Sequence, residues 1–572
     1  MNRDAPLVVQ TDRTILLETD HPRFEEARAR LSQFAELEKS PQFVHFYRMT
    51  PVSLWNAAAL GVSLVSIVEY LARAARYPVA HTVVEEIGRW YERYGQIRFV
   101  PGDRDGALRM LVEPSAEVDK VLTSPSVRPF LPGFVAGRSE VEFDATHRGV
   151  LKHCLVKLGY PVRDEAGYRG GSSLAVELRT APVGDFVPRD YQVSAAAAFW
   201  QEGRASGGCG VVVLPCGAGK TVVGLSVMAL AKTRTLILTT NTVAVRQWRR
   251  EILDRTSLRP ADVAEYTGES KAIAPVTIAT YQILTWRRTR SEPFTHFALL
   301  EQNDWGLVIY DEVHLLPAPV FRATATMQAR RRLGLTATLV REDGREGDVF
   351  SLIGPKRYEM PWRDLERAGW LAAAHCHEIR VGMNEVRQAA YATASLRRRA
   401  KLAAENERKL DVVGALLRRH RGDRVLLIGQ YLDQLRVLAK SFDIPLITGR
   451  TPNAERERLY AEFRDGRLDR LIVSKVGNFA IDLPDANVLI QLSGAFGSRQ
   501  EEAQRLGRIL RPKGEDGGDA WFYTVVTDHS TDLEFSARRQ LFLAEQGYAY
   551  SIIAAEDLRP DAGSEEVRSW GA

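Results

Sequence analysis

The octapeptide Leu214–Thr221, Leu-Pro-Cys-Gly-Ala-Gly-Lys-Thr, has the residue types and spacing of a phosphate-binding loop. It follows the apolar run Gly210–Val213, which predicts a buried strand, and it precedes a segment with helical periodicity. A glycine-rich turn between a strand and a helix is the setting in which Gly-Lys-Thr binds phosphate. The common pattern has glycine at the first position, where this chain has Leu214.

Each residue of this loop has a role that phosphate chemistry requires. Gly217, Ala218 and Gly219 form a turn whose backbone N–H groups converge on phosphate oxygens, and the helix N-terminus adds partial positive charge. Lys220 reaches the β- and γ-phosphates, and the Thr221 hydroxyl binds Mg²⁺. The competing interpretation is a glycine-rich turn that binds nothing.

Two carboxylates follow an apolar strand farther along the chain. Asp311 and Glu312 come directly after Leu307–Tyr310 and are followed by Val313 and His314. Asp311 is predicted to bind Mg²⁺ directly or through water, and Glu312 to activate the attacking water as a general base. The alternative is an acidic turn after a core strand. Together with the loop, this pair predicts hydrolysis of a nucleoside triphosphate.

The segment before the loop contains candidates for recognition of the base. The Gln192 amide can hydrogen-bond both the ring nitrogen and the exocyclic amine of adenine, which predicts ATP as the nucleotide. Phe186 either stacks on the base or packs in the core. Thr336 and Thr338 follow a further predicted strand and are candidates for hydrogen bonds to the acidic pair.

A further group of charged residues lies in the C-terminal part of the chain. Arg505, Arg508 and Arg511 recur at every third position, so they share one face of a helix. Arg508 and Arg511 are predicted to stabilise charge on the γ-phosphate across a cleft between two domains. Arg505 is assigned to an ion pair or to the nucleotide cleft, and Asp482 to the ribose or to coupling between the domains.

The composition is that of a globular protein of several domains. The 572 residues are 45% apolar and 26% charged, and the net charge of +5 means that any surface for nucleic acid must be local. The four cysteines show no Cys-x-x-Cys pairing, which predicts free thiols, a reducing cytoplasmic location and no zinc site. No apolar run approaches the length of a membrane span, so we expect no membrane association.

The alternation of strand-like and helical patterns predicts an α/β fold in six segments. Strands that alternate with helices indicate parallel βαβ units, and two regions show this rhythm. The segments are an N-terminal helical domain over 1–100, a small α+β domain over 101–180, a first parallel α/β domain over 181–345, a basic insertion over 346–410, a second parallel α/β domain over 411–550 and a polar tail over 551–572. The predicted strands are Gly210–Leu214, Thr235–Thr239, Val276–Ala279, Leu307–Tyr310 and Leu333–Leu335 in the first α/β domain, and Arg424–Ile428, Leu446–Thr448, Leu471–Val473, Val488–Gln491 and Trp521–Thr524 in the second.

The N-terminal segments carry weaker signals. A β-like stretch at Leu7–Leu17 is followed by three predicted helices, Ser53–Leu60, Ser63–Ala75 and His81–Tyr94, which fit either a winged-helix DNA-binding module or a helical docking domain. The next segment has strand-like runs at Leu108–Val112, Val141–Phe143 and Ser173–Leu178. Its pattern indicates no function.

The insertion is the most basic part of the chain. Between Lys356 and Arg424 there are 16 Lys and Arg against 9 Asp and Glu. Its centre is a cluster of four cations predicted to contact the phosphates of DNA, namely Arg397, Arg398, Arg399 and Lys401. The alternative is a solvated helix face.

These motifs together resemble those of the XPB family of superfamily 2 helicases, in its bacterial and archaeal form. Leu214–Thr221 resembles the first motif of that family, and the leucine at its first position follows the family pattern. Asp311-Glu312-Val313-His314 resembles its DEVH box, and Arg341-Glu342-Asp343 resembles its R-E-D motif. Residues 474–484 and 504–511 resemble its fifth and sixth motifs, and Asn478 departs from the acidic residue of eukaryotic members.

The resemblance implies two RecA-like parallel-sheet motor domains, a thumb-like insertion over 346–410 and a damage-recognition-like domain over 101–180. It implies ATP- and Mg²⁺-dependent 3′-to-5′ unwinding of forked DNA in repair, by a monomeric motor that works with a nuclease of the Bax1 type. Arg341, Glu342 and Asp343 are implicated in opening the duplex, with a polar loop as the alternative.

Three other activities remain open. A double-strand DNA translocase would use the same ATP cycle without processive unwinding. A DNA-binding scaffold with a vestigial nucleotide site belongs to another class, and an RNA substrate is not excluded by the bare motifs.

Overall fold

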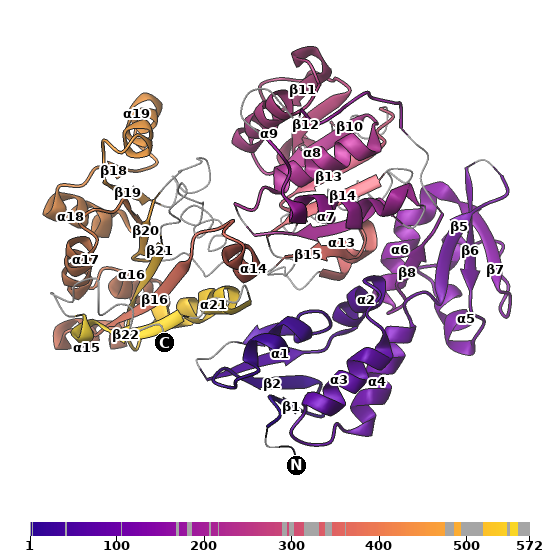
Figure 1. Ribbon diagram of the computed structural model, residues 1–572, viewed down its shortest axis with the longest axis horizontal. Helices are drawn as coiled ribbons and strands as arrows, with labels where there is room; N and C mark the ends of the chain where they lie inside the picture. Colours follow the sequence, from indigo (N-terminus) through magenta and orange to yellow (C-terminus); the bar gives the residue numbers. More distant parts are fainter. Residues whose placement is uncertain are drawn as a thin grey trace. The chain divides into compact units, whose positions relative to one another are not determined.

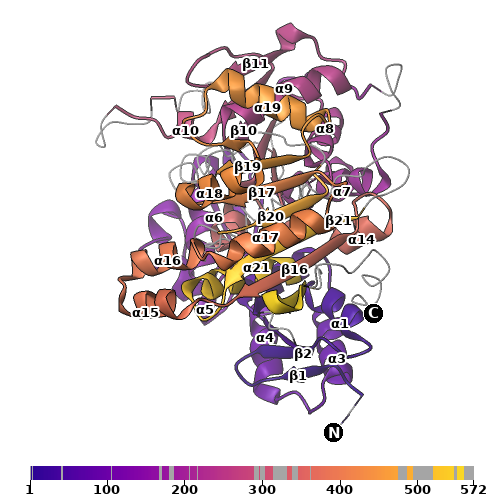
Figure 2. The same ribbon diagram turned by 90° about the vertical axis from the view of Figure 1, so that its left-hand side faces the viewer.

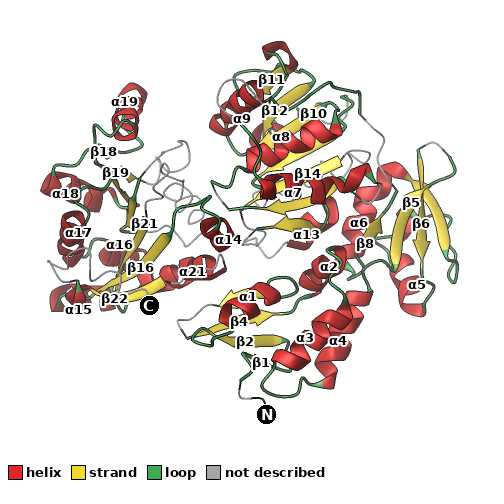
Figure 3. Cartoon of the chain, viewed as in Figure 1, coloured by secondary structure: helices red, strands yellow, loops and turns green. Residues whose placement is uncertain are grey.

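The computed structural model describes most of the chain (Figures 1 and 3). The described residues are 2, 4–39, 43–104, 106–166, 171–179, 186–204, 207–215, 217–288, 295–296, 303–313, 331–337, 346–360, 362–474, 486–493, 519–545 and 550–558. The chain divides into two compact units, Met1–Leu214 with Gly219–Met360, and Pro361–Ala572 with the short loop segment Pro215–Ala218.

The first unit contains a seven-stranded parallel sheet in the order β11-β12-β10-β13-β14-β9-β15. Its strands are β9 (Cys209–Val213), β10 (Thr235–Thr239), β11 (Val263–Tyr266), β12 (Val276–Thr280), β13 (Leu307–Asp311), β14 (Arg331–Thr336) and β15 (Lys356–Glu359). Its helices are α7 (Asp190–Trp200), α8 (Lys220–Ala231), α9 (Thr242–Arg255), α10 (Tyr281–Leu284) and α13 (Glu346–Leu352). The five predicted strands are confirmed within one or two residues, because each is a mostly apolar run buried on both faces, as parallel sheets require.

The strand order brings the predicted site residues to one edge of this sheet. β14 lies between β9 and β13, with Thr336 opposite Val213 and Leu335 opposite Asp311. The carboxyl ends of parallel strands meet at the same edge, where such sheets bind ligands. The loop after β9 and the carboxylates after β13 therefore emerge side by side, separated by one strand.

The second unit contains another seven-stranded parallel sheet, in the order β18-β19-β17-β20-β21-β16-β22. Its strands are β16 (Ala374–Val381), β17 (Val425–Gly429), β18 (Leu446–Ile447), β19 (Arg470–Ser474), β20 (Val488–Gln491), β21 (Ala520–Thr527) and β22 (Tyr550–Ala554). Its helices are α14 (Trp362–Arg367), α15 (Glu385–Thr393), α16 (Leu396–Ala404), α17 (Arg408–Arg419), α18 (Leu432–Phe442), α19 (Asn453–Arg464) and α21 (Thr531–Glu545). Figure 2 shows α17 lying across this sheet, where Val412, Val413 and Leu416 pack into the core with Leu427 and Ile490. Two such parallel sheets are the α/β architecture that the sequence predicted.

The N-terminal part of the first unit combines helices with a small sheet. The antiparallel order is β1-β2-β4-β3, made of β1 (Leu7–Val9), β2 (Thr14–Glu18), β3 (Glu36–Lys39) and β4 (Val44–Arg48). The helices are α1 (Phe24–Leu31), α2 (Pro51–Ala59), α3 (Leu64–Ala74) and α4 (His81–Glu92). The three predicted helices are present, and Thr50 caps α2 by accepting a 3.0 Å hydrogen bond from the Ser53 N–H.

The next part of the chain is a second small sheet in the order β7-β6-β5-β8. Its elements are β5 (Ile97–Pro101), β6 (Ala107–Val112), β7 (Glu140–Asp144), β8 (Val162–Asp164), α5 (Ala116–Leu122) and α6 (Arg148–Lys157). The strand predicted at Ser173–Leu178 is wrong. The segment instead makes two isolated bridges, Ser173 to Thr233 and Leu178 to Thr256, so only its ends pair with the first parallel domain.

The segment predicted as one basic insertion, 346–410, divides between the two units. Its first part contains α13 and β15, and β15 pairs with β9 at the edge of the first sheet. Its second part contains β16, which pairs along its whole length with β21 inside the second sheet. Sequence periodicity does not reveal which strand a segment pairs with, and the partners here are distant in the chain.

Among the described helices no single one is long and apolar enough to cross a membrane. Only α2 and α3 together, bent by 119°, meet the criterion of length and composition.

Candidate functional site

The predicted phosphate-binding loop joins β9 to α8. Gly217 and Gly219 have φ of 84° and 74°, in the left-handed region that glycine adopts without strain. Gly219 is the N-cap residue of α8, so the Lys220 and Thr221 side chains start the first helical turn. Within this turn the Ala218 N–H donates a 3.2 Å hydrogen bond to the Pro215 carbonyl, so the turn closes directly before the N-terminus of α8.

Leu214 has a structural reason for its place in this loop. Its side chain is fully buried, and its N–H donates a 2.9 Å hydrogen bond to the Thr336 carbonyl. This bond extends the pairing of β9 and β14 by one residue, so the position continues a strand and does not need a turn residue. A buried leucine therefore suits the position better than glycine.

Gln192 lies against this loop from the first turn of α7. Its Oε1 accepts a 2.9 Å hydrogen bond from the Arg189 N–H, and a Cβ added to Gly219 would clash with its Nε2. The structure thus brings Gln192 to the loop, and adenine recognition stays a prediction. The Arg255 guanidinium lies 4.1 Å from the centre of the Phe186 ring and covers one of its faces.

The acidic pair meets the loop lysine at the end of β13. Lys220 Nζ lies 3.2 Å from Glu312 Oε1, and both side chains are largely buried. Glu312 has a φ of 51°, which is uncommon for a residue with a side chain and is a form of strain found at functional sites. This ion pair places Glu312 beside the loop that is predicted to bind phosphate.

Asp311 is held by hydrogen bonds from two aromatic residues. Its Oδ2 accepts a 2.9 Å hydrogen bond from Trp248 Nε1, and its carbonyl accepts a 2.7 Å bond from the Tyr281 hydroxyl. Burial and the adjacent Glu312 charge raise the pKa of Asp311 to about 6. Burial likewise raises the pKa of Tyr281 well above its usual value, so its hydroxyl remains a donor.

Trp248 and Gly224 were not found by reasoning from the sequence. Gly224 lies on α8, and a Cβ there would come within 2.6 Å of Trp248 Cη2. The missing side chain makes room for the indole that binds Asp311. The available signal was a lone tryptophan in the polar run Arg246–Arg250, which is too common a pattern to indicate a site.

The described residues of this site fit a magnesium ion. Two adjacent carboxylates face one lysine, which leaves one negative charge that a cation would offset. Oxygen ligands from Asp311 and Thr221 are those that Mg²⁺ prefers.

Several predicted site residues lie outside the described residues. They are His314, Thr338, Arg341, Glu342, Asp343, Asp482, Arg505, Arg508 and Arg511. Their roles remain predictions.

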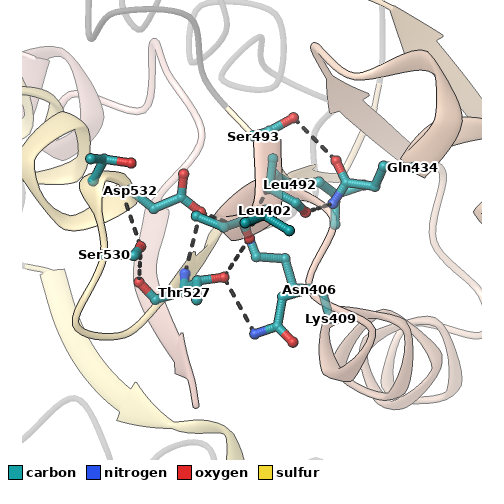
Figure 4. Close-up of polar contacts among 12 residues, drawn as sticks. Leu402, Asn406, Lys409, Gln434, Leu492, Ser493, Thr527, Ser530 and Asp532 are labelled. Atoms are coloured by element: carbon teal, nitrogen blue, oxygen red, sulfur yellow. Dashed lines mark hydrogen bonds and ion pairs between the residues drawn. The ribbon is translucent and has the colours of Figure 1, made fainter. Parts of the chain in front are cut away.

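A buried polar network holds the carboxyl end of β20, from which the chain continues toward Arg508 and Arg511 (Figure 4). Lys409 is almost fully buried, and its Nζ donates to the Leu492 carbonyl at 2.9 Å and pairs with Asp532 Oδ2 at 2.8 Å. Ser493 Oγ hydrogen-bonds Gln434 Oε1, and Gln434 Nε2 donates to the Ala404 carbonyl. The end of β20 is therefore fixed to α16, α17, α18 and α21 by named polar contacts.

The four cations of the predicted DNA-binding cluster differ in their surroundings. Arg398 is exposed on α16, and nothing is described of the Arg397 side chain. Arg399 donates to the Tyr391 and Ala392 carbonyls at the end of α15, at 3.1 and 2.7 Å. Lys401 pairs with Asp433 at 3.1 Å, which raises its pKa. Arg399 and Lys401 thus have structural partners within the second unit.

Three family models match successive parts of the chain. Residues 7–132 match a model described as a helicase conserved C-terminal domain, 185–341 a type III restriction enzyme res subunit, and 365–566 an ERCC3/RAD25/XPB C-terminal helicase.

Curated relatives match almost the whole chain. The DNA 3′-5′ helicase XPB of Kineococcus radiotolerans is 51% identical over 98% of this chain and 99% of its own, and that of Mycobacterium tuberculosis is 50% identical over 97% and 99%. A general transcription and DNA repair factor IIH helicase/translocase subunit XPB of Antonospora locustae is 35% identical over 99% of this chain and 85% of its own.

With identities of this size over nearly the full length, and with the phosphate loop and acidic pair joined at the edge of a RecA-like sheet, the chain belongs to the XPB family of helicases.

Proposed function

We propose that this protein is a DNA-dependent ATPase that unwinds DNA in the 3′-to-5′ direction during DNA repair. The observation that carries the proposal is the 3.2 Å ion pair between Lys220 of the phosphate loop and Glu312 after β13. It joins the two motifs that an ATP hydrolase needs in one place. The names of the bacterial relatives give DNA as the substrate and 3′-to-5′ as the direction of unwinding.

The chemistry follows from the side chains at this edge of the sheet. The loop N–H groups and Lys220 bind the phosphates of ATP, and Gln192 contacts the adenine. Mg²⁺, held by Thr221 and Asp311, would neutralise charge between the β- and γ-phosphates. Glu312 accepts a proton from the attacking water, and Arg508 and Arg511 stabilise the charge that develops on the γ-phosphate.

The direct test measures ATP hydrolysis and strand displacement on the same forked DNA. Hydrolysis that rises on addition of DNA, together with displacement on substrates with a 3′ tail only, supports the proposal. Displacement restricted to 5′ tails contradicts the polarity.

A second candidate is a double-strand DNA translocase without processive unwinding. The eukaryotic relatives carry both words, helicase and translocase, in their names. Displacement of a triplex strand without separation of a forked duplex would favour this activity over the helicase.

Arg341, Glu342 and Asp343 are assigned to opening the duplex. If they act on the strands and not on ATP, replacing all three with alanine slows strand displacement more than ATP hydrolysis. An equal loss of both rates contradicts the assignment and favours a polar loop.

The same measurements also test two further classes of protein. A non-catalytic DNA-binding scaffold predicts no DNA-stimulated hydrolysis and no effect of Lys220→Ala. An RNA motor predicts stronger stimulation by RNA than by DNA of the same sequence.

The partner, the oligomeric state and the location extend the proposal. We place the motor, as a monomer, in the cytoplasm. The location is supported by Cys154 and Cys209, which form no disulfide bond. Cleavage of DNA would need a nuclease of the Bax1 type, since no nuclease motif stands out in the sequence. A forked-DNA cleavage assay with and without that nuclease tests this pairing.

A further inference from the structure

A cavity of 380 Å³ lies within the first unit, apart from the residues assigned to ATP. Three parts of the chain form its walls: the end of α2 with Leu60 and Gly61, the second small sheet with α6 and β8, and the β9 and β15 edge of the parallel sheet. Its volume falls at the lower end of small-molecule sites, which span about 300–1,000 Å³. It admits a small molecule and no length of duplex DNA.

Cations outnumber carboxylates among the described residues that line this cavity. Lys152, Arg163 and Arg357 face it, against Asp164 alone. Asp164 already has a second cation behind it, because Arg148 Nε donates to its Oδ2 at 2.8 Å. Arg163 Nε also pairs with Glu165 Oε1 at 2.8 Å, so the four cations Arg148, Lys152, Arg163 and Arg357 exceed the two carboxylates Asp164 and Glu165 by two charges.

Lys152 is a buried cation that shares its carboxylate partner with Arg148. Its side chain is only 12% exposed, and its Nζ donates to Asp164 Oδ2 at 3.2 Å, sharing that oxygen with Arg148. An ammonium has three N–H donors, and the Asp164 bond is the only one recorded for Lys152 in the described part of the chain. Burial lowers the pKa of Lys152, whereas Arg148 and Lys152 overcome the effect of burial on Asp164 and hold the pKa of that carboxyl well below its usual value.

The opposite wall combines the Phe350 ring with the Arg357 side chain, and contacts hold both in place. The Phe350 ring on α13 packs against Trp55 and Tyr94, with centroids 6.0 and 6.2 Å apart. The Lys356 N–H donates to Asn56 Oδ1 at 3.1 Å, which fixes β15 to α2. Arg357 is oriented by donating from Nε to the Cys209 carbonyl at 2.9 Å.

We propose that this cavity binds a small phosphate-bearing molecule, whose anionic group contacts Lys152, Arg163 and Arg357 and whose remainder lies against Phe350. A phosphate group offers several acceptor oxygens, which suits cations that converge from different elements. Because the walls come from both accessory parts and the first parallel domain, the bound anion stabilises their contact.

The purely structural alternative is an ion triad that ties α6 to β8. Arg148 alone can satisfy Asp164 through a two-point contact, so the triad does not need Lys152 to neutralise the carboxylate. The two interpretations differ in what removal of Lys152 does to anion binding.

The test measures pyrophosphate binding to the full-length chain by calorimetry without Mg²⁺. All the proteins carry Lys220→Ala, because this substitution weakens phosphate binding at the ATP loop. Adding Lys152→Met is expected to weaken the affinity at least tenfold, and adding Lys157→Met, an exposed lysine of the same helix, to change it less than twofold. Arg163→Gln replaces a half-exposed side chain, so folding is preserved, and it is expected to weaken binding several-fold. Lys152→Arg is expected to retain most of the affinity.

The outcomes separate the sources of the ligand and can overturn the proposal. Tighter binding of AMP than of pyrophosphate points to a nucleotide, and the reverse to an inorganic anion. Equal affinities in the Lys152→Met, Arg163→Gln and Lys157→Met proteins would contradict the site. Release of pyrophosphate by forked DNA would also contradict it, by assigning these cations to a DNA surface.

Discussion

Lys220 Nζ lies 3.2 Å from Glu312 Oε1, although Lys220 follows β9 and Glu312 follows β13, two strands that are separated by β14. The lysine neutralises the carboxylate that is assigned as the general base. A γ-phosphate entering the loop would compete for the same ammonium and release Glu312 to bind water. The residues assigned to phosphate binding and to proton abstraction therefore form one ion pair.

Trp248 is predicted to support catalysis by orienting Asp311. Trp248→Phe removes the 2.9 Å hydrogen bond to Asp311 Oδ2 and is expected to lower the rate of ATP hydrolysis about tenfold, the usual effect of losing a residue behind a metal ligand. The measurement is the Mg²⁺ dependence of hydrolysis, which should shift to higher concentration. An unchanged Mg²⁺ dependence would contradict the orienting role.

Gly224 gives an independent test of the same contact. A Cβ at Gly224 would displace the indole, so Gly224→Ala is expected to lower hydrolysis, whereas Gly88→Ala on α4, which has room for a methyl group, is expected to leave it unchanged. In the double variant Gly224→Ala with Trp248→Phe, the smaller ring leaves space, so the two losses should not multiply. Multiplying losses would show that Gly224 acts through something else.

The basic segment is predicted to divide into DNA-binding and structural cations. Arg398→Ala should weaken DNA binding and reduce the slope of log affinity against log salt by about one. Arg399→Ala should instead destabilise the second unit by about 1 kcal/mol, because Arg399 binds the last carbonyls of α15. Lys440→Ala on the exposed face of α18 is the matched control. The division fails if Arg398→Ala leaves the salt slope unchanged.

Lys409 is predicted to stabilise the second unit through its buried contacts. Lys409→Met leaves Asp532 and the Leu492 carbonyl without their buried donor and is expected to cost about 3 kcal/mol of the free energy of unfolding. Adding Asp532→Asn removes the unpaired charge and should recover part of that loss. Urea unfolding measures the stability of both variants, and Lys440→Met is the exposed control. A Lys409→Met protein as stable as that control would contradict the stabilising role of Lys409.

The strands and the nucleotide motifs were predictable because each depends on local pattern. The runs Thr235–Thr239 and Val488–Gln491 are mostly apolar and buried along their whole length, as strands covered on both faces must be. The loop at Gly217 and Gly219 and the carboxylates at Asp311 follow such strands directly, so one parallel sheet was enough to bring them together.

What could not be predicted depends on long-range packing. Trp248 reaches Asp311 because α9 packs on the sheet beside α8, and no local signal distinguishes that tryptophan from a core residue. The division of 346–410 between two sheets depends on β15 pairing with β9 and β16 with β21, which are distant in the chain. The partners of Arg399 and Lys401 likewise lie on neighbouring helices. A count of charges along the sequence cannot reveal these partners, so it does not distinguish Arg399 and Lys401 from the exposed Arg398.

ATP hydrolysis by Glu312→Gln in the presence of forked DNA tests the central claim most directly. The substitution keeps the size of the side chain and removes the base, so hydrolysis should fall by about 10²–10⁴-fold while ATP and DNA still bind. Lys220→Ala should also abolish hydrolysis, with DNA binding largely kept. Normal turnover by Glu312→Gln would contradict the assignment of Glu312 as general base and the ATPase site built around it.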